Sequence, residues 1–248
     1  FIHQPVQSEM HMSTLLVVNS SPVTDNSKTR ELVSRFVERY QAREAGVEVL
    51  NRDIGRNPPP HIDEVMIGAY YTPEDARNPA QQQAIQLSDT LVDELLDSDV
   101  LVIGSPMHNF SVTSALKTWI DHVARVGRTF QYGANGPEGL VKGKKAYVIS
   151  ARGGRYSEGS PAAGYNHQDT YLKTVLGFIG ITDVVFINAE GVASGEQGVL
   201  EAASQIDSAS GIRLTRIAQF LIARSFLPGM ISTTIAATNG MKVMRVRM

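Results

Sequence analysis

Five short runs of mainly apolar residues are spread along the chain, and continuous apolar runs of this length are typical of strands buried in a parallel sheet. They cover Thr14–Asn19, Val47–Leu50, Val100–Ile103, Lys145–Ser150 and Val184–Asn188. Between and after these runs, apolar positions recur every three or four residues, which is the spacing of one face of a helix. Alternating strands and helices with right-handed crossovers predict an α/β fold, with a five-stranded parallel sheet in the order 2-1-3-4-5 and helices on both faces.

The predicted helices all show this amphipathic spacing. The first carries an apolar face made of Leu32, Val33, Phe36, Val37 and Tyr40. The others span Pro79–Asp97, follow the candidate caps Ser111, Thr113 and Ser114, span Asp169–Gly177 and lie within Leu200–Ala223. The helix after the caps should bury Leu116, Ile120 and Val123, which share one face.

The two ends of the chain lack such a pattern. Residues 1–11 show no periodicity and precede Met12, so we expect a non-native or disordered N-terminal extension there. Residues 224–248 contain no acidic residue, and we expect them to form a peripheral or non-native C-terminal tail. We therefore expect residues 12–223 to fold as one domain.

Three loops follow the carboxyl ends of predicted parallel strands, so they should meet at one edge of the sheet. Ligands of open α/β sheets bind at this edge. The loop Ser20–Thr29 is rich in hydroxyls and opens a helix, which suits a phosphate, although Ser27 would also serve as a simple helix cap. Met107–Phe110 follow the central strand. Ala151–Gly154 end in two glycines that let backbone amides approach a flat ligand, although turn chemistry explains them equally well. FMN, with one phosphate and a planar ring, would satisfy all three loops.

Composition excludes several classes of chemistry. The chain contains no cysteine, which removes disulfides, thiolate nucleophiles, zinc–thiolate sites and iron–sulfur clusters. Its formal charge of −2 gives no reason to expect nucleic acid or an anionic membrane as partner. No apolar run approaches the roughly 20 residues that span a bilayer, and no signal-peptide pattern opens the chain, so we expect a cytoplasmic protein.

Several motif-like stretches do not carry chemistry. The glycine-rich stretch Phe130–Gly143 reads as a loop that precedes a strand, whereas a dinucleotide fingerprint must follow one. Gly139–Lys145 lacks the spacing and the hydroxyl of a phosphate-binding P-loop. His61, Asp63 and Glu64 lie close together in sequence, but such a pattern is weak support for a metal site, and we expect no metal.

No side chain stands out as a catalyst. Ser105, His108 and Asp121 do not form a credible triad, because no G-x-S-x-G motif encloses a serine. We expect His108 and His122 to make structural hydrogen bonds rather than act as bases. A bound redox cofactor that carries the reaction is the economical interpretation.

From about Met12 to Ala223, the chain resembles the bacterial FMN-dependent NADH:quinone oxidoreductases, also called azoreductases, which have a flavodoxin-like fold. The matching stretches are PMHNF (106–110), LKTWIDHVARVGRTFQY (116–132), GPEGLVKGKKA (136–146), ARGG (151–154), LGFIGITDV (176–184) and AEG (189–191). Together they are highly specific. The chain departs from the family at His108, where tyrosine is usual, and at Ala151, where serine is usual.

The resemblance implies an FMN site with defined residues. The phosphate and ribityl chain would be held by Ser21, Ser27, Lys28 and Thr29. Met107, His108, Asn109 and Phe110 would flank the isoalloxazine, with Ala151, Arg152, Gly153 and Gly154 on its polar edge. It also implies a homodimer in which Phe110, Tyr132 and Phe178 shape the substrate pocket, Phe178 coming from the partner subunit.

The implied activity is a ping-pong reaction in which NADH or NADPH passes hydride to the flavin N5 and an aromatic acceptor then replaces the nicotinamide. Quinones would be reduced by two electrons in one step, and an azo bond would be cleaved in two rounds. Two alternatives stay open from the residues alone: a flavodoxin-like electron carrier that docks on proteins, and a non-catalytic flavin-binding regulator. Neither the preference between NADH and NADPH nor the physiological acceptor follows from the sequence.

Overall fold

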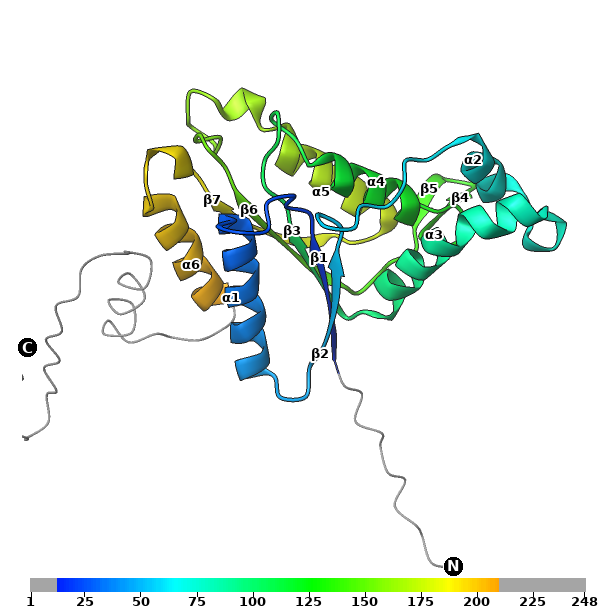
Figure 1. Cartoon of the computed structure of the whole chain (residues 1–248), viewed down its shortest axis with the longest axis horizontal. Helices are drawn as coiled ribbons and strands as arrows, with labels where there is room; N and C mark the ends of the chain where they lie inside the picture. Colours follow the sequence, from blue (N-terminus) through cyan, green and yellow to red (C-terminus); the bar gives the residue numbers. More distant parts are fainter. Residues whose placement is uncertain (1–12, 210–248) are drawn as a thin grey trace, which may run out of the picture. The chain divides into compact units, whose positions relative to one another are not determined.

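The computed structural model describes residues 13–209, and a parallel five-stranded sheet lies at the centre of this region (Figure 1). Its strands are β1 (Thr14–Asn19), β2 (Glu48–Asp53), β3 (Val100–Gly104), β6 (Lys145–Ala151) and β7 (Asp183–Ala189). They are hydrogen-bonded in the order β2-β1-β3-β6-β7, and every neighbouring pair is parallel. The predicted fold class and strand order are confirmed.

Helices cover both faces of this sheet (Figure 1). One face carries α1 (Lys28–Arg43) and α6 (Gln197–Ala209), and the other carries α3 (Pro79–Asp97), α4 (Ser114–Val123) and α5 (His167–Ile179). A short helix α2 (Glu64–Tyr71) packs on α3. Three single-turn 3₁₀ helices complete the set: Glu74–Ala76, Ala163–Tyr165 and Val192–Ser194.

The central strand β3 is buried along its whole length, as its continuous apolar run predicts. Of the candidate caps for the helix that follows it, Thr113 is the one that is used, because its hydroxyl accepts a hydrogen bond from the Leu116 amide at 3.2 Å. The predicted face of α4 points into the core, where Leu116, Ile120 and Val123 are buried. Strand, turn and helix therefore form one rigid unit at the middle of the fold.

Several element boundaries differ from the sequence prediction. Strand β2 ends at Asp53 rather than Leu50, because pairing with β1 continues through polar residues. Helix α5 begins two residues earlier than predicted, where Asn166 caps it by accepting a hydrogen bond from the Asp169 amide. Helix α6 begins at Gln197 and reaches the end of the described residues. Helix α2 was not predicted at all.

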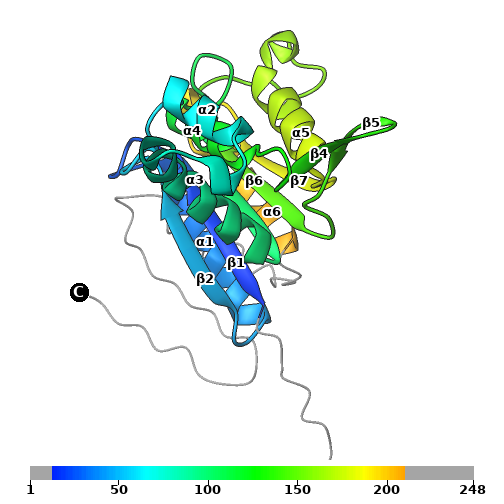
Figure 2. The same cartoon turned by 90° about the vertical axis from the view of Figure 1, so that its right-hand side faces the viewer.

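The glycine-rich stretch predicted as a loop is instead largely a β-hairpin, made of β4 (Phe130–Gly133) and β5 (Gly136–Gly139) (Figure 2). The prediction failed because this hairpin is held by tertiary contact rather than by an apolar pattern. Gly139 lies against the end of α5 so closely that a Cβ there would be 2.2 Å from the Gly180 amide nitrogen. The amide of Val141 also donates to the Ile179 carbonyl at 2.9 Å, which fixes the hairpin on α5.

The interpretations of residues 1–11 and 224–248 as extensions lie outside the described residues, as does the C-terminal part of the predicted domain 12–223. Within residues 13–209, no helix has the length and apolar character needed to cross a membrane.

Candidate active site

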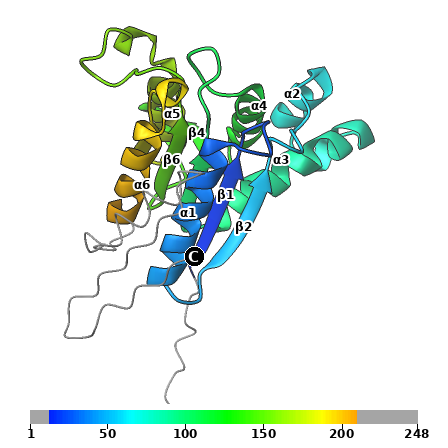
Figure 3. The ribbon, with the colours of Figure 1, turned by 60° about the vertical axis from the view of Figure 1, so that its left-hand side comes forward.

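The loops that follow β1, β3 and β6 lie at one end of the sheet (Figure 3), and Ala151 joins them through its backbone. Its carbonyl accepts a hydrogen bond from the Met107 amide at 3.2 Å, and its amide donates to the Thr29 hydroxyl at 3.2 Å. Thr29 is buried at the first turn of α1. The predicted convergence of the three loops is therefore present in the fold.

The first loop ends at the N-terminus of α1, and Ser27 caps that helix. The Ser27 hydroxyl accepts from the Arg30 amide at 3.4 Å and lies 2.9 Å from the Ser21 hydroxyl. The capping role that competed with a phosphate-binding role is thus confirmed. The amides of Lys28 and Thr29 lie in the first turn, where no intrahelical carbonyl is available, so they remain able to donate to an anion.

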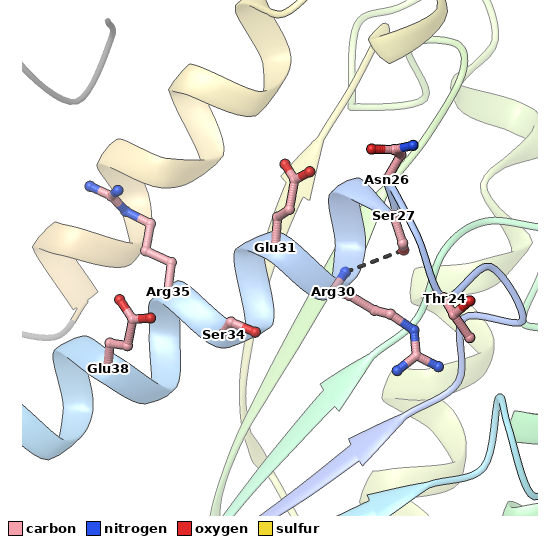
Figure 4. Close-up of a pocket in the computed structure, with 8 residues that line it drawn as sticks. All are labelled: Thr24, Asn26, Ser27, Arg30, Glu31, Ser34, Arg35 and Glu38. Carbon is pink, nitrogen blue, oxygen red and sulfur yellow. Dashed lines mark hydrogen bonds between the residues drawn. The ribbon is translucent and has the colours of Figure 1, made fainter. Parts of the chain in front are cut away.

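Beside this helix end, the structure has an open pocket of about 420 Å³ on the outer face of α1 (Figure 4). It is lined by Thr24, Asn26, Ser27, Arg30, Glu31, Ser34, Arg35 and Glu38. The Arg30 guanidinium is already paired, because it donates to both oxygens of Asp53 at 2.7 and 2.8 Å. These hydrogen bonds outweigh burial and hold the pKa of Asp53 below its usual value. Ser27 is the predicted site residue that lines this pocket.

The loop after β3 makes a tight turn with an unusual backbone. His108 and Ser111 exchange two backbone hydrogen bonds, of 3.0 and 2.9 Å, around Asn109 and Phe110. Both central residues have positive φ, 46° for Asn109 and 70° for Phe110, as in a type I′ turn. Asparagine tolerates this region, but for a bulky residue such as phenylalanine it is strained. Strain of this kind clusters at functional sites, which supports a binding role for the turn.

Phe110 belongs to a cluster of aromatic rings that sequence reasoning missed. Its ring centroid lies 5.3 Å from that of Tyr165 and 6.2 Å from that of Tyr156. Phe110 and Tyr165 are 45% and 57% exposed, so the cluster offers apolar ring surface to solvent at this end of the sheet. The only signal in the sequence is the presence of two tyrosines in an otherwise polar, glycine-rich stretch.

The stretch after β6 divides into two parts. The amides of Ala151 and Arg152 donate within the protein, to the Thr29 hydroxyl and the Ala189 carbonyl. The amides of Gly153 and Gly154 donate to no acceptor among residues 13–209. A Cβ on Gly153 would make ordinary contact with the Cβ of Ala193, at 3.8 Å. Gly153 and Gly154 are therefore the residues of this stretch whose amides can bind a ligand.

The Arg152 side chain does not point toward a ligand. It is completely buried and donates to Glu190 at 3.3 Å and to Asp169. Glu190 also accepts from the amides of Tyr156 and Ser157 at 2.9 and 3.2 Å. Burial opposes ionisation of Glu190, but these amides and the Arg152 charge outweigh it and keep the pKa of Glu190 below its usual value. None of these partners of Arg152 was predicted as a site residue.

Tyr132 and Phe178 lie in a second aromatic group. Phe130 links them, with ring centroids 5.7 Å from Tyr132 and 4.6 Å from Phe178. Tyr132 is 72% exposed on the hairpin. Among the described residues, no ring contact joins this group to Phe110. A single chain therefore does not assemble all three predicted substrate-pocket residues into one ring cluster.

The histidines behave differently from one another. His122 is buried, and its Nε2 donates to the Pro60 carbonyl at 3.0 Å, so its expected structural role is confirmed. His108 is exposed, and its ring forms no hydrogen bond with the described part of the chain. Near His61, Asp63 caps α2 by accepting from the Met66 amide at 2.8 Å. No group of three candidate metal ligands occurs within residues 13–209.

Sheet order, helices on both faces and a ligand edge at the strand ends define a flavodoxin-like α/β protein. The family described as "flavodoxin-like fold" matches residues 13–209. The chain is 53% identical over 191 residues to an FMN-dependent NADH:quinone oxidoreductase of Herminiimonas arsenicoxydans, covering 77% of this chain and 93% of that protein. The corresponding identity to FMN-dependent NADH:quinone oxidoreductase 3 of Pseudomonas aeruginosa is 43% over 202 residues, with 80% and 93% covered.

Solved structures agree with this assignment. An azoreductase from Bacillus anthracis superposes with a TM-score of 0.75 at 25% identity, covering 80% of this chain and 99% of that one. An FMN-dependent NADH-azoreductase from the same species, solved in complex with FMN, has the same fold, with a TM-score of 0.74 at 24% identity and 84% and 100% covered. The chain belongs to the family of FMN-dependent NADH:quinone oxidoreductases.

Proposed function

We propose that this protein is an FMN-dependent NADH:quinone oxidoreductase that also cleaves aromatic azo compounds. The observation that carries the proposal is the junction at Ala151, which brings together a helix N-terminus, a strained aromatic turn and two unpaired glycine amides. A cofactor with one phosphate and a planar, hydrogen-bonding ring fits this combination. The relatives and solved structures named above have the same activities in their names.

The residues present fit FMN. Ser21, Ser27, Lys28 and Thr29 would hold its phosphate and ribityl chain, through hydroxyls and the free amides of the first turn of α1. Met107, His108, Asn109 and Phe110 would flank its ring system. Gly153 and Gly154 would donate to the polar edge of the ring through amides that have no acceptor within residues 13–209. Ala151 and Arg152 would support these contacts from within the protein.

When bound, FMN supplies hydride transfer from NADH to a quinone or azo acceptor. The protein contributes position and electrostatics rather than an acid or base. Fixed glycine amides favour negative charge on the polar edge of the ring, and they need no reorganisation during the reaction. Phe110, with Tyr156 and Tyr165 behind it, offers ring surface on which a planar donor or acceptor can stack. We propose that donor and acceptor use this surface in turn, in ping-pong order.

We further propose that the enzyme is a homodimer. Tyr132 is exposed on the hairpin and is not joined to the Phe110 cluster within one chain. A second copy would complete the acceptor pocket with Tyr132 and with Phe178 of the partner subunit. Analytical ultracentrifugation of the FMN-loaded protein tests this arrangement, and a monomer with full quinone activity would contradict it.

The test of function uses the purified full-length protein loaded with FMN. Its visible absorption should bleach with NADH in the absence of oxygen and return when benzoquinone is added. Initial rates at several quinone concentrations should give parallel double-reciprocal lines. A protein that binds FMN but reduces neither quinone nor azo dye would be an electron carrier or a regulator instead, and intersecting lines would exclude the ping-pong order.

A further inference from the structure

Arg152 is fully buried, and every nitrogen of its guanidinium is hydrogen-bonded. Nε donates to the Ser150 hydroxyl at 3.1 Å and to Gln168 Oε1 at 3.1 Å. Nη1 donates to Glu190 at 3.3 Å, and Nη2 donates to Asp169. A buried charge is tolerated only when it is paired and hydrogen-bonded, and this one is paired with two carboxylates.

The partners of Arg152 come from three parts of the fold. Ser150 lies in β6, Gln168 and Asp169 open α5, and Glu190 follows β7. Gln168 extends the network to the end of β3, because its Nε2 donates to the Ser105 carbonyl at 2.8 Å and hydroxyl at 2.9 Å. One guanidinium therefore cross-links the carboxyl ends of three neighbouring strands.

The network also fixes the backbone on both sides of the free glycine amides. The carbonyls of Arg152, Gly153 and Gly154 accept from the amides of residues 191–193, at 3.0, 3.3 and 2.9 Å. Just beyond, the carboxylate of Glu190 accepts hydrogen bonds from the amides of Tyr156 and Ser157. With its carbonyls and its flanking amides fixed, the stretch has the two glycine amides left to bind a ligand.

We propose that Arg152 is a positioning residue for FMN: through Glu190 and Asp169 it holds the Gly153–Gly154 amides in the direction that the flavin edge requires. This inference rests on the proposed function. Arg152 itself touches no cofactor. Without its charge, Glu190 and Asp169 would be two carboxylates with no buried cation between them, and Glu190 would no longer be held where it anchors Tyr156 and Ser157.

The experiment compares Arg152→Lys with Arg125→Lys in the full-length protein. Lysine keeps the charge but lacks the planar fork that reaches several partners at once. Arg125 is an equally suitable control, because its side chain is only 4% exposed and it is paired with Asp89, in a network that includes none of the candidate site residues. Four quantities are measured for each variant: the FMN dissociation constant of the apoprotein, its melting temperature, and the visible spectrum and midpoint potential of the bound flavin.

Arg152→Lys should weaken FMN binding by about ten- to a hundredfold, the range seen when residues that orient metal ligands are lost, and should shift the spectrum and potential of the flavin that still binds. Arg125→Lys should lower the melting temperature but leave FMN affinity, spectrum and potential as in the wild type. Glu190→Gln serves as a second variant should Arg152→Lys not fold. It keeps an acceptor for the Tyr156 amide and should change the same flavin properties in the same direction.

Two results would overturn the positioning role. If Arg152→Lys binds FMN as the wild type does, Arg152 does not position the Gly153 and Gly154 amides. If both lysine variants weaken FMN binding in proportion to their loss of stability, Arg152 is structural only. A wild-type apoprotein that binds no FMN would instead refute the proposed function, and the positioning role with it.

Discussion

Two arginines are buried within residues 13–209, in two different regions, and their surroundings differ in kind. Arg152 is held between two carboxylates at the ligand edge of the sheet, with all its nitrogens bonded. Arg125 lies among helices, where it donates to the Ser88 hydroxyl at 2.7 Å and to Asp89 at 3.1 Å. Its guanidinium stands 4.6 Å over the Tyr70 ring, and its Nε has no partner within residues 13–209.

These differences show how one residue type can serve two purposes. Arg125 joins α2 to α3 and the end of α4, and burial lowers its pKa even though Asp89 partly offsets the effect. It acts like a large amphipathic side chain that fills space and keeps its charge partnered. Arg152 instead connects strand ends, and every nitrogen of its guanidinium is hydrogen-bonded. Substitutions in the Arg125 region should therefore change stability alone, whereas those in the Arg152 region should change FMN binding as well.

The largest expected effect tests this contrast directly. Arg152→Met should lower the free energy of unfolding by about 3–5 kcal/mol, because it leaves two carboxylates without their buried cation. Arg125→Met should cost about 1–3 kcal/mol, the cost of leaving hydrogen-bonding groups unsatisfied. Urea denaturation of the two apoproteins measures both values. Equal losses would remove the distinction between the regions.

Tyr70→Leu should produce the next largest effect, confined to stability. The substitution removes the ring beneath Arg125 and the hydrogen bond from the Tyr70 hydroxyl to the Asp121 carbonyl. A desolvated cation–π contact is worth about 2 kcal/mol, so the melting temperature should fall. FMN affinity, measured by fluorescence titration, should not change, and a change of tenfold would show that the two regions are coupled.

Phe110→Gly, at the candidate site, should lower activity without lowering stability. Glycine relieves the positive φ of this turn, which costs a residue with a Cβ about 1–2 kcal/mol. This gain exceeds the roughly 0.4–1 kcal/mol that glycine adds in unfolded-chain entropy, so the apoprotein should not lose stability. The ring that stacks with Tyr165 is lost, so quinone turnover should fall. Phe110→Leu is the control, since it keeps the strain and removes only the aromatic surface. If Phe110→Gly loses no activity, the ring is not part of the acceptor site.

The smallest expected effect concerns pH. Burial lowers the pKa of His122 below the usual value for histidine, despite the hydrogen bond to Pro60 and the nearby Asp121 charge, and the Arg125 charge lowers it further. Below about pH 6.5, the unfolded chain therefore takes up a proton that the folded chain does not. The free energy of unfolding then decreases as the pH is lowered. Between this pH and the lowered folded value, denaturation curves of His122→Gln should depend less on pH. An unchanged slope would assign the pH dependence to other groups.

Much of the fold could be predicted because its signals are local. Apolar runs such as Val100–Ile103 and the helical spacing of Pro79–Asp97 identify buried strands and amphipathic helices without knowledge of their neighbours. Helix α2 was missed because its residues, EVMIGAYY, show no clear apolar stripe and follow three prolines. The hairpin was missed because the contact of Gly139 with Gly180 that fixes it is not visible in the sequence.

The candidate site was predictable only in part, for the same reason. The three loops follow from the rule that ligands bind at strand ends, and the structure joins them at Ala151. Three partners of Arg152, namely Gln168, Asp169 and Glu190, lie 16 to 38 residues away along the chain, and nothing local marks them as one network. The tyrosines that contact Phe110 were likewise indistinguishable from ordinary loop residues.

Helix α5 connects two features that are distant in sequence terms. Its first residues, Gln168 and Asp169, hold the Arg152 guanidinium, and its last turn supports the hairpin that carries Tyr132. At 13 residues the helix is about 20 Å long. A single helix therefore links the candidate cofactor site to the hairpin on which Tyr132 is exposed.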